Sequence, residues 1–407
     1  MEDNKNSKKS FKCNIPVILI TALTTCLLTI IVIFAFVIKG ESIGKYVFVQ
    51  GSKEGEEISS ELKKYKTIVD QYFLGDVDEN KMKEGAIKGY IEGLDDPYTE
   101  YMTKDEMKNF MEDTKGNFVG IGIYMTSDKT VDLIKVLATM KGSPAEKVGI
   151  KAGDYIKTVN GEKYTSADLT TISNKIKGEE GTKVKLEIVR DNETLEFEVV
   201  REKIDVKQVD GKVLKDNIGY IDISSFDEST ANEFKEKFEE LNKQNLKGLI
   251  IDLRNNGGGI VSEALKIADF IADKDSVLLY EVDKNQKEVV KKANSNPIIK
   301  MPVVILTNEN TASASEILAG ALKDLGKAKT VGTKTYGKGV IQEILTLTDG
   351  SGLKITTEEY KTPNKTKIHK VGIEPDEKVE LPEKLKNNVI VNEEDDVQLQ
   401  KAIEMLK

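Results

Sequence analysis

The heptapeptide Thr311-Ala312-Ser313-Ala314-Ser315-Glu316-Ile317 follows a predicted buried strand, residues 303–307, and opens a helix predicted to end near Leu325. The chain before it alternates in the same way between strand-like and helix-like stretches: 218–223, 229–242, 248–253 and 262–272. Alternating strands and helices predict an α/β core. We therefore expect an α/β domain over residues 204–386, with Ser313 where a strand leads into a helix.

The composition narrows the chemistry that this serine could perform. The 407 residues include one histidine, His369, so a serine hydrolase that relays protons through histidine is almost excluded. Both cysteines, Cys13 and Cys26, lie near the N-terminus, which excludes a disulfide framework and a cysteine nucleophile from the rest of the chain. The formal charge of −9 argues against nucleic acid as the main partner. We expect neither a metal nor any other cofactor.

A second segment, Tyr336-Gly337-Lys338-Gly339-Val340-Ile341-Gln342, supplies a lysine that could activate the serine. A solvent-exposed lysine has a pKa near 10.4, so a base at this position requires burial beside apolar residues such as Val340. Gln342 could hydrogen-bond the amine and orient it. Both catalytic candidates also have an ordinary explanation, because most lysines are solvated and Ser313 with Glu316 fits a helix-capping box.

A glycine-rich stretch follows the predicted strand at 248–253. It reads Asp252-Leu253-Arg254-Asn255-Asn256-Gly257-Gly258-Gly259, and glycines let backbone N–H groups approach a ligand closely. One of these N–H groups, together with that of Ala314, would hold the oxyanion that forms when a serine attacks a peptide carbonyl. Gly258 and Gly259 are the candidates, and the sequence does not decide between them. Taken alone, the stretch is equally typical of a flexible strand-to-helix turn.

Residues 115–203 have a mostly β texture with glycine and aspartate turns. The run Gly142–Asp154 precedes a helix predicted over 167–176 and a hairpin predicted over 183–200. This order resembles a PDZ domain. The resemblance implies that a glycine-containing loop binds a peptide C-terminal carboxylate through backbone N–H groups while the peptide adds a strand. The candidate peptide-binding residues are Phe118, Val119, Gly120, Ile121, Gly122 and Ile123.

The N-terminal region contains an uncharged apolar stretch, residues 15–38. As a helix it would be about 36 Å long, enough to cross a hydrocarbon core of about 30 Å. Lysines precede it, so residues 1–14 are predicted to be cytoplasmic and the body to lie outside the cell membrane. A cleaved signal peptide is the alternative, but the apolar run is long and lacks a small-x-small site. The flanking predictions are a polar tether over 39–57, a helical module over 58–114 and a C-terminal tail helix within 387–407.

The three core motifs occur together in one known family. In order and spacing they resemble those of the C-terminal-processing peptidases, also called tail-specific proteases, and the resemblance runs from about Ser60 to Leu406. It implies that Ser313 is the nucleophile, that Lys338 is the general base and that Gln342 assists the lysine. It also implies an inserted PDZ domain that holds the substrate tail and gates the site. The expected function is a bacterial serine endopeptidase that cleaves exported proteins recognised by their apolar C-terminal tails.

Two other functions are alternatives to this peptidase hypothesis. Residues 332–338 match the start of a P-loop, but Gly339 stands where a serine or threonine must hold Mg²⁺, and a strand follows instead of a helix. The serious alternative is a PDZ scaffold that binds protein C-termini at the cell surface without cutting them. The intact Ser313, Lys338 and Gln342 argue against it. The sequence leaves open a homodimer, a regulatory partner, and whether the PDZ domain inhibits or activates.

Overall fold

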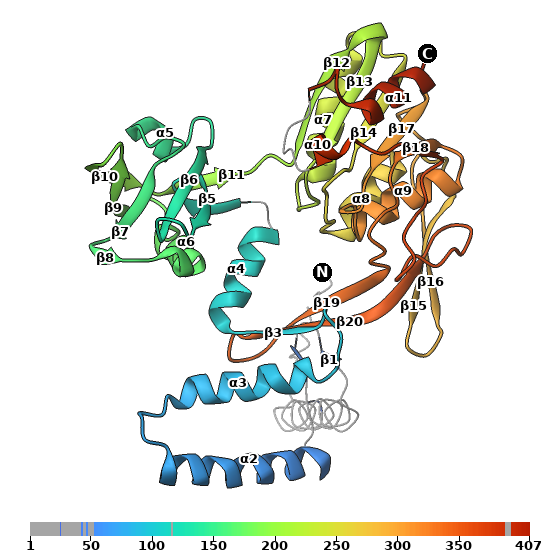
Figure 1. Cartoon of the computed structure of the whole chain (residues 1–407). Coiled ribbons are helices and arrows are strands. Elements are labelled where there is room, and N and C mark those ends of the chain that lie inside the picture. Colours follow the sequence, from blue (N-terminus) through green and yellow to red (C-terminus); the bar gives the residue numbers. More distant parts are fainter. Residues whose placement is uncertain (1–24, 26–41, 44–45, 48–52, 115–116, 387–391) are drawn as a thin grey trace, which may run out of the picture. The chain divides into compact units, whose positions relative to one another are not determined.

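The computed structural model describes residues 25, 42–43, 46–47, 53–114, 117–386 and 392–407. The chain divides into two units, residues 1–107 with 342–356, and residues 108–341 with 357–407. Figure 1 labels most elements of both units. Of the predicted membrane span, only Thr25 is described, so that prediction otherwise falls outside the described residues. None of the described helices is both long and apolar enough to cross a membrane.

The first unit contains two exposed helices, α2 (Lys53–Tyr72) and α3 (Glu79–Glu92), with no buried residue in either. Asp78 caps α3 by accepting hydrogen bonds from the N–H groups of the next turn. Helix α2 begins before the predicted start at Ile58, so the end of the predicted tether is helical. The helical module expected from the sequence is therefore present.

Short strands complete the first unit. Strand β3 (Glu100–Met102) pairs with the first residues of β20 (Gly352–Lys361). Strand β20 follows β19 (Val340–Thr346), and the two are neighbours in one sheet. Two-residue strands β1 (Ser42–Ile43) and β2 (Tyr46–Val47) pair with each other, and helix α4 spans Lys104–Thr114.

The next domain is mostly β, with strands in the order β10-β9-β7-β6-β5 and β8 paired to β7. Strand β5 (Ile123–Asp128) therefore lies at an edge of the sheet, and helix α6 (Leu169–Ile176) packs beside it. This is the arrangement that the PDZ prediction requires. The other elements are β4 (Asn117–Gly120), β6 (Leu133–Thr139), α5 (Pro144–Val148), β7 (Tyr155–Val159), β8 (Glu162–Lys163), β9 (Lys183–Arg190), β10 (Glu193–Val200) and β11 (Glu202–Asp205).

The core contains a six-stranded sheet in the order β12-β13-β14-β17-β18-β21. Strand β12 is antiparallel to its neighbour, and the other strands run parallel. The predicted α/β core is thus confirmed, with one antiparallel edge strand. The strands are β12 (Val209–Leu214), β13 (Ile218–Ile223), β14 (Gly248–Asp252), β17 (Val303–Thr307), β18 (Ala328–Gly332) and β21 (Glu377–Lys378).

Helices cover both faces of this sheet because alternate strand side chains enter two apolar clusters. Leu249 and Ile251 pack with α7, α8 and α9, whereas Ile250 between them packs with α11. Such strands are apolar on both faces, which is why they appear as continuous hydrophobic runs. The helices are α7 (Thr230–Asn242), α8 (Val261–Asp269), α9 (Ala314–Asp324), α10 (Glu383–Lys386) and α11 (Val397–Met405).

The parallel strands explain why three distant motifs meet. Strands β14, β17 and β18 lie side by side and point the same way, so their C-terminal ends share one edge of the sheet. The glycine-rich stretch follows β14, the Ser313 turn follows β17, and the Lys338 segment follows β18. Ligand sites of open α/β sheets form at this edge.

One hairpin of the second unit was not predicted from the sequence. Strand β15 (Val277–Asp283) pairs with β16 (Glu288–Lys292) on one side and with residues 358–361 of β20 on the other. Strand β16 is mostly exposed and rich in charge, so it lacks the alternation of apolar and polar residues by which strands are found.

Candidate active site

Ser313 lies in the turn that opens α9, and its backbone conformation is strained. Its φ and ψ are 57° and −118°, a combination that residues other than glycine avoid at a cost of about 1–3 kcal/mol. An ordinary helix cap does not require it, because capping residues adopt extended conformations. A strained strand-to-helix turn is how α/β hydrolases present a nucleophile. The conformation therefore favours a functional role over simple capping.

Glu316 joins the Ser313 turn to the Lys338 segment. Its fully buried carboxylate accepts hydrogen bonds from the N–H of Ser313 at 2.9 Å and from the N–H of Lys338 at 2.8 Å. It also accepts from the hydroxyl of Thr335 and the N–H of Gly337. Burial raises the pKa of this carboxyl above its usual value, although these four donors oppose the shift. One side chain thus holds the two predicted catalytic residues in a common backbone network.

The environment of Lys338 differs from that of a solvated lysine. The residue is half-buried between two glycines that pack closely on neighbouring backbone. A Cβ added to Gly339 would lie 2.3 Å from the backbone N of His369, so the single histidine lies beside this segment. Gln342 belongs to the first unit, where its amide donates to the Thr356 hydroxyl over 3.3 Å. Its assistance to Lys338 stays a prediction.

The glycine-rich stretch lies directly against the serine turn. A Cβ on Gly258 would be 2.8 Å from the Ser313 Cβ and 2.9 Å from the Ala314 N, and Gly258 has a φ of 102°. Only glycine fits this approach. The Gly258 N–H donates to the Asn256 side-chain oxygen at 2.8 Å, and Asn256 is fully buried. Gly259 packs against Phe226, and no hydrogen-bond partner of the Gly259 or Ala314 N–H is found among the described residues.

Further bonds fix the two loops to each other. The Thr311 hydroxyl donates to the Leu253 carbonyl at 2.8 Å, and the Ala312 N–H donates to the Asn256 carbonyl at 3.0 Å. The Ser315 hydroxyl donates to the same Asn256 carbonyl at 3.1 Å. Ser315 is thus a structural residue of the turn, as its position inside the helix predicts. These contacts bring the predicted oxyanion residues and Ser313 into one site.

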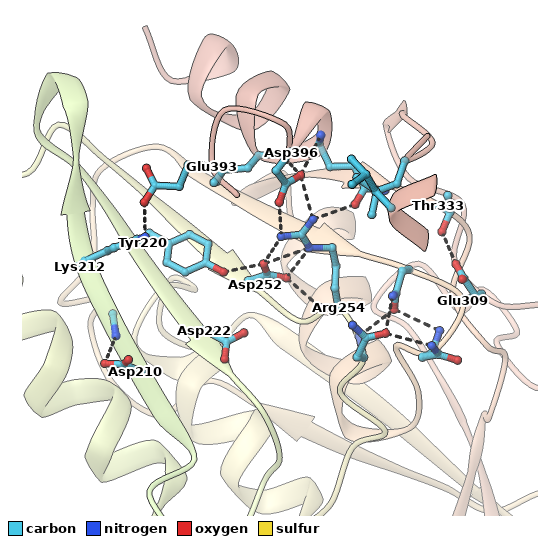
Figure 2. Close-up of a pocket in the computed structure, with 18 residues that line it drawn as sticks. Asp210, Lys212, Tyr220, Asp222, Asp252, Arg254, Glu309, Thr333, Glu393 and Asp396 are labelled. Carbon is cyan, nitrogen blue, oxygen red and sulfur yellow. Dashed lines mark hydrogen bonds and ion pairs between the residues drawn. The ribbon is translucent and has the colours of Figure 1, made fainter. Parts of the chain in front are cut away.

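A largely buried arginine supports the start of the glycine-rich stretch (Figure 2). Arg254 contacts Asp252 at 2.6 Å and Asp396 at 2.8 Å, and it donates to the Gln398 side chain at 3.0 Å. Burial alone would lower its pKa, but the two carboxylates raise it above the usual arginine value. The Tyr220 hydroxyl donates to Asp252 at 2.8 Å. Arg254 therefore ties the C-terminal helix α11 to the loop that leads to Gly258.

The same residues line a cavity of about 600 Å³ (Figure 2). Asn255, Asn308 and Asn310 lie on its wall and bond one another, which connects the cavity to the loop before Ser313. Ser313 and Lys338 are not among its lining residues. Asp222 also lies on the wall, and burial together with the charge of Asp252 raises the pKa of Asp222 to about 6.

The peptide-binding loop predicted in the β domain precedes the edge strand β5. Ile121 is fully buried, whereas Gly122 has a φ of 73° and would place a Cβ 2.5 Å from the Ser143 Cβ. Within the described part of the chain, the N–H groups of Ile121 and Gly122 have no hydrogen-bond partner. Backbone N–H groups left open beside an edge strand fit a carboxylate and an added strand.

Comparison with known proteins places the chain in a family. A Staphylococcus haemolyticus (strain JCSC1435) protein named "Probable CtpA-like serine protease" is 40% identical over 363 residues, which cover 88% of this chain and 72% of that protein. The sequence model of peptidase family S41 also matches this chain. The chain belongs to peptidase family S41. A Staphylococcus saprophyticus protein of the same name is 38% identical over 375 residues, covering 92% of this S41 peptidase and 75% of the relative.

Sequence models of three domains agree with the described elements of this S41 peptidase. The model for peptidase family S41 matches residues 217–379, the model for a PDZ domain matches 135–190, and the model for the N-terminal domain of the activating protease CtpB matches 38–106. The solved structure named "Putative S41 protease" from Bacteroides fragilis NCTC 9343 superposes with a TM-score of 0.51 at 16% identity, covering 82% of this chain and 92% of that one. This likeness bears on the fold alone. The predicted family is confirmed, and the chain is a serine peptidase.

Sequence reasoning missed several residues that shape the site of this S41 peptidase. Glu316 was interpreted only as a capping partner, although a glutamate among small apolar residues of one helix was a signal of a buried role. The pairing of Arg254 with Asp396 has no sequence signal, because 142 residues separate them. No group of histidine, cysteine, aspartate or glutamate side chains suited to a metal occurs among the described residues.

Proposed function

We propose that this S41 peptidase cleaves proteins with a Ser313–Lys338 dyad after its PDZ domain has bound their apolar C-terminal tails. The observation that carries the proposal is the Glu316 carboxylate, which accepts hydrogen bonds from the backbone N–H groups of both dyad residues. The strained backbone of Ser313 supports the assignment of the nucleophile. The open N–H groups of Ile121 and Gly122 support tail binding.

The proposed reaction begins when neutral Lys338 takes the proton of the Ser313 hydroxyl as its oxygen attacks the substrate carbonyl. The Ala314 N–H and the N–H of Gly258 or Gly259 stabilise the oxyanion. The tetrahedral intermediate breaks its C–N bond, and Lys338 returns the proton to the leaving amine. Water then gives a proton to Lys338 and attacks the acyl-enzyme, and the Ser313 oxygen leaves with that proton. Gln342 orients the lysine in this scheme.

The experiment is cleavage of an unfolded reporter protein that ends in apolar residues, by the full-length protein. Wild type should cleave it, whereas Ser313→Ala and Lys338→Ala should not. His369→Ala is the control that separates this dyad from a serine–histidine pair, since His369 lies beside the Lys338 segment. It should retain cleavage. Cleavage by Lys338→Ala would show that Lys338 is not the base. The same conclusion would follow if His369→Ala were the one variant of the three that lost cleavage.

Tail recognition is tested with two reporters that differ only in their last three residues, apolar in one and acidic in the other. An apolar tail should lower KM, because it fits the apolar residues around β5 and α6 while its carboxylate binds the open N–H groups. Equal KM values for the two reporters would show that the PDZ domain does not select the tail. Ser313→Ala should still bind the apolar tail without cutting it.

We also propose that residues 15–38 anchor the protein in the cell membrane, with the N-terminus in the cytoplasm and the peptidase outside. The length, the apolar character and the preceding lysines of this segment support the proposal. Protease treatment of intact cells should degrade the peptidase body, and the protein should sediment with membranes. A soluble form lacking the N-terminal residues would indicate a cleaved signal peptide instead.

A further inference from the structure

Tyr360 is a fully buried tyrosine whose hydroxyl reaches the main chain of both dyad residues. Its oxygen lies 2.6 Å from the Lys338 carbonyl oxygen and 3.0 Å from the Ser313 carbonyl oxygen. Both distances lie within the range of hydrogen bonds, so the single hydroxyl proton is shared between two acceptors. Ser313 and Lys338 are 25 positions apart in sequence, and this side chain spans them directly.

The position of that hydroxyl is fixed from several sides. The Tyr360 N–H donates to the Gly339 carbonyl at 3.0 Å, and Tyr360 pairs with Glu281 of β15 in an antiparallel ladder. The ring lies in an apolar cluster with Leu279 and Ile317. A close-packed ring on a paired strand cannot shift without moving its neighbours. The hydroxyl is therefore a fixed point for the two carbonyl groups.

Tyr360 and Glu316 act on different groups of the same two residues. Glu316 accepts from the N–H groups of Ser313 and Lys338, whereas Tyr360 donates to their carbonyl groups. Both peptide groups flanking each dyad residue are thus restrained. A strained turn such as that of Ser313 persists only when its surroundings restrain it in this way.

We propose that Tyr360 is a positioning residue that sets the spacing between Ser313 and Lys338. This inference rests on the proposed dyad. Proton transfer from a serine to a lysine requires the two side chains to stay within hydrogen-bond reach. A misplacement of about 1 Å at a reacting group can reduce the rate by about 100-fold. Loss of the Tyr360 hydroxyl removes this bridge between the two carbonyl groups while the ring continues to fill its cavity. The Ser313 carbonyl then keeps only the Ile317 N–H of its own helix, at 3.0 Å.

The test compares Tyr360→Phe with wild type in the full-length protein, using the apolar-tailed reporter at a temperature where circular dichroism shows both to be folded. The kcat should fall by about 10- to 100-fold, while KM stays within twofold, because the PDZ loop is untouched. Tyr164→Phe is the matched control, since it removes a hydroxyl that donates to Glu162 in the PDZ domain. Its kcat should equal that of wild type.

A purely structural role for Tyr360 would lower the melting temperature and leave kcat of the folded protein unchanged, which would overturn the inference. The outcome is distinguishable from failure of the dyad itself. If Ser313→Ala or Lys338→Ala still cleaves the reporter, the proposed function fails. If both are inactive and Tyr360→Phe keeps its kcat within twofold of wild type, the dyad stands and Tyr360 does not position it.

Discussion

The PDZ loop and the core glycine stretch both place a glycine with positive φ beside a proposed anion, yet their N–H groups differ. In the PDZ loop, Gly122 N–H has no hydrogen-bond partner among the described residues. In the core, Gly258 N–H already donates to the buried Asn256 side chain. The first site is ready to accept a carboxylate. The second must exchange one bond before Gly258 can stabilise an oxyanion.

This difference in hydrogen bonding suits the two functions that we propose, which are carboxylate binding in the PDZ loop and oxyanion stabilisation in the core. A substrate carboxylate carries its charge before it binds, so an open pair of N–H groups can accept it directly. An oxyanion exists only during the reaction, and a donor held elsewhere in the resting protein stabilises nothing until the substrate carbonyl arrives. The Ala314 N–H has no described partner and is available throughout. Of the two candidate glycine donors, only Gly258 has to exchange a bond, because the Gly259 N–H has no partner among the described residues.

The largest expected effect would separate binding from chemistry. Lys338→Arg should reduce kcat/KM by about 10⁴-fold, because arginine does not deprotonate near neutral pH and cannot accept the serine proton. Binding of an apolar tail peptide to the PDZ domain should be unchanged, as measured by fluorescence anisotropy. Substantial turnover in this variant would show that position 338 is not the base.

A smaller effect is expected from a substitution in the glycine-rich stretch of the core. Gly258→Ala should lower kcat by about 100-fold or more, because the new Cβ would lie 2.7 Å from the Ala312 carbonyl oxygen and 2.8 Å from the Ser313 Cβ. The KM for the tailed reporter should stay near the wild-type value. Gly153→Ala is the control for backbone strain alone, because Gly153 has a φ of 92°, close to the 102° of Gly258, with open space around the new methyl group. Equal losses in the two variants would contradict a specific role for Gly258.

The PDZ side is tested by Gly122→Ala. The added Cβ would lie 2.5 Å from the Ser143 Cβ, at a φ of 73°, and should distort the carboxylate loop. We expect KM for the apolar-tailed reporter to rise about tenfold while kcat at saturation is kept, which corresponds to about 1.4 kcal/mol of tail binding. Gly142→Ala, at a φ of 76° with no atom nearby, is the control. A fall in kcat instead would link the loop to the chemistry.

The smallest expected effect is on the free energy of unfolding, and it comes from Asp222 on the cavity wall. Because its folded-state pKa is raised to about 6, Asp222 should destabilise the fold as pH rises from about 4 through 6. Asp222→Asn should therefore increase the free energy of unfolding at pH 7 by on the order of 1–2 kcal/mol, after allowance for solvent screening. The gain should nearly vanish at about pH 3, where the carboxyl is mostly protonated in both the folded and the unfolded state. Urea denaturation at both pH values measures this, and a stability loss at pH 7 would refute it.

Much of the fold was predictable from local patterns. The continuous apolar strands at 248–252 and 303–307, and the helices between them, follow from periodicity alone. The hairpin β15–β16 was not predictable, because its second strand is exposed and has no alternating pattern. The start of α2 was misjudged, since its first turn is polar and resembles a tether. Local sequence predicts a helix or strand where burial requires a regular spacing of apolar residues.

Sequence by itself determined which residues are available for chemistry: Ser313, Lys338, and a glycine-rich stretch, in a chain with one histidine. Only the tertiary structure decided how they are held. Parallel pairing of β14, β17 and β18 brings their C-terminal ends to one edge, and Glu316 and Tyr360 then bridge the main chains of Ser313 and Lys338. The reason is physical: hydrogen bonds between residues distant in the chain depend on strand order and burial, which no local pattern encodes.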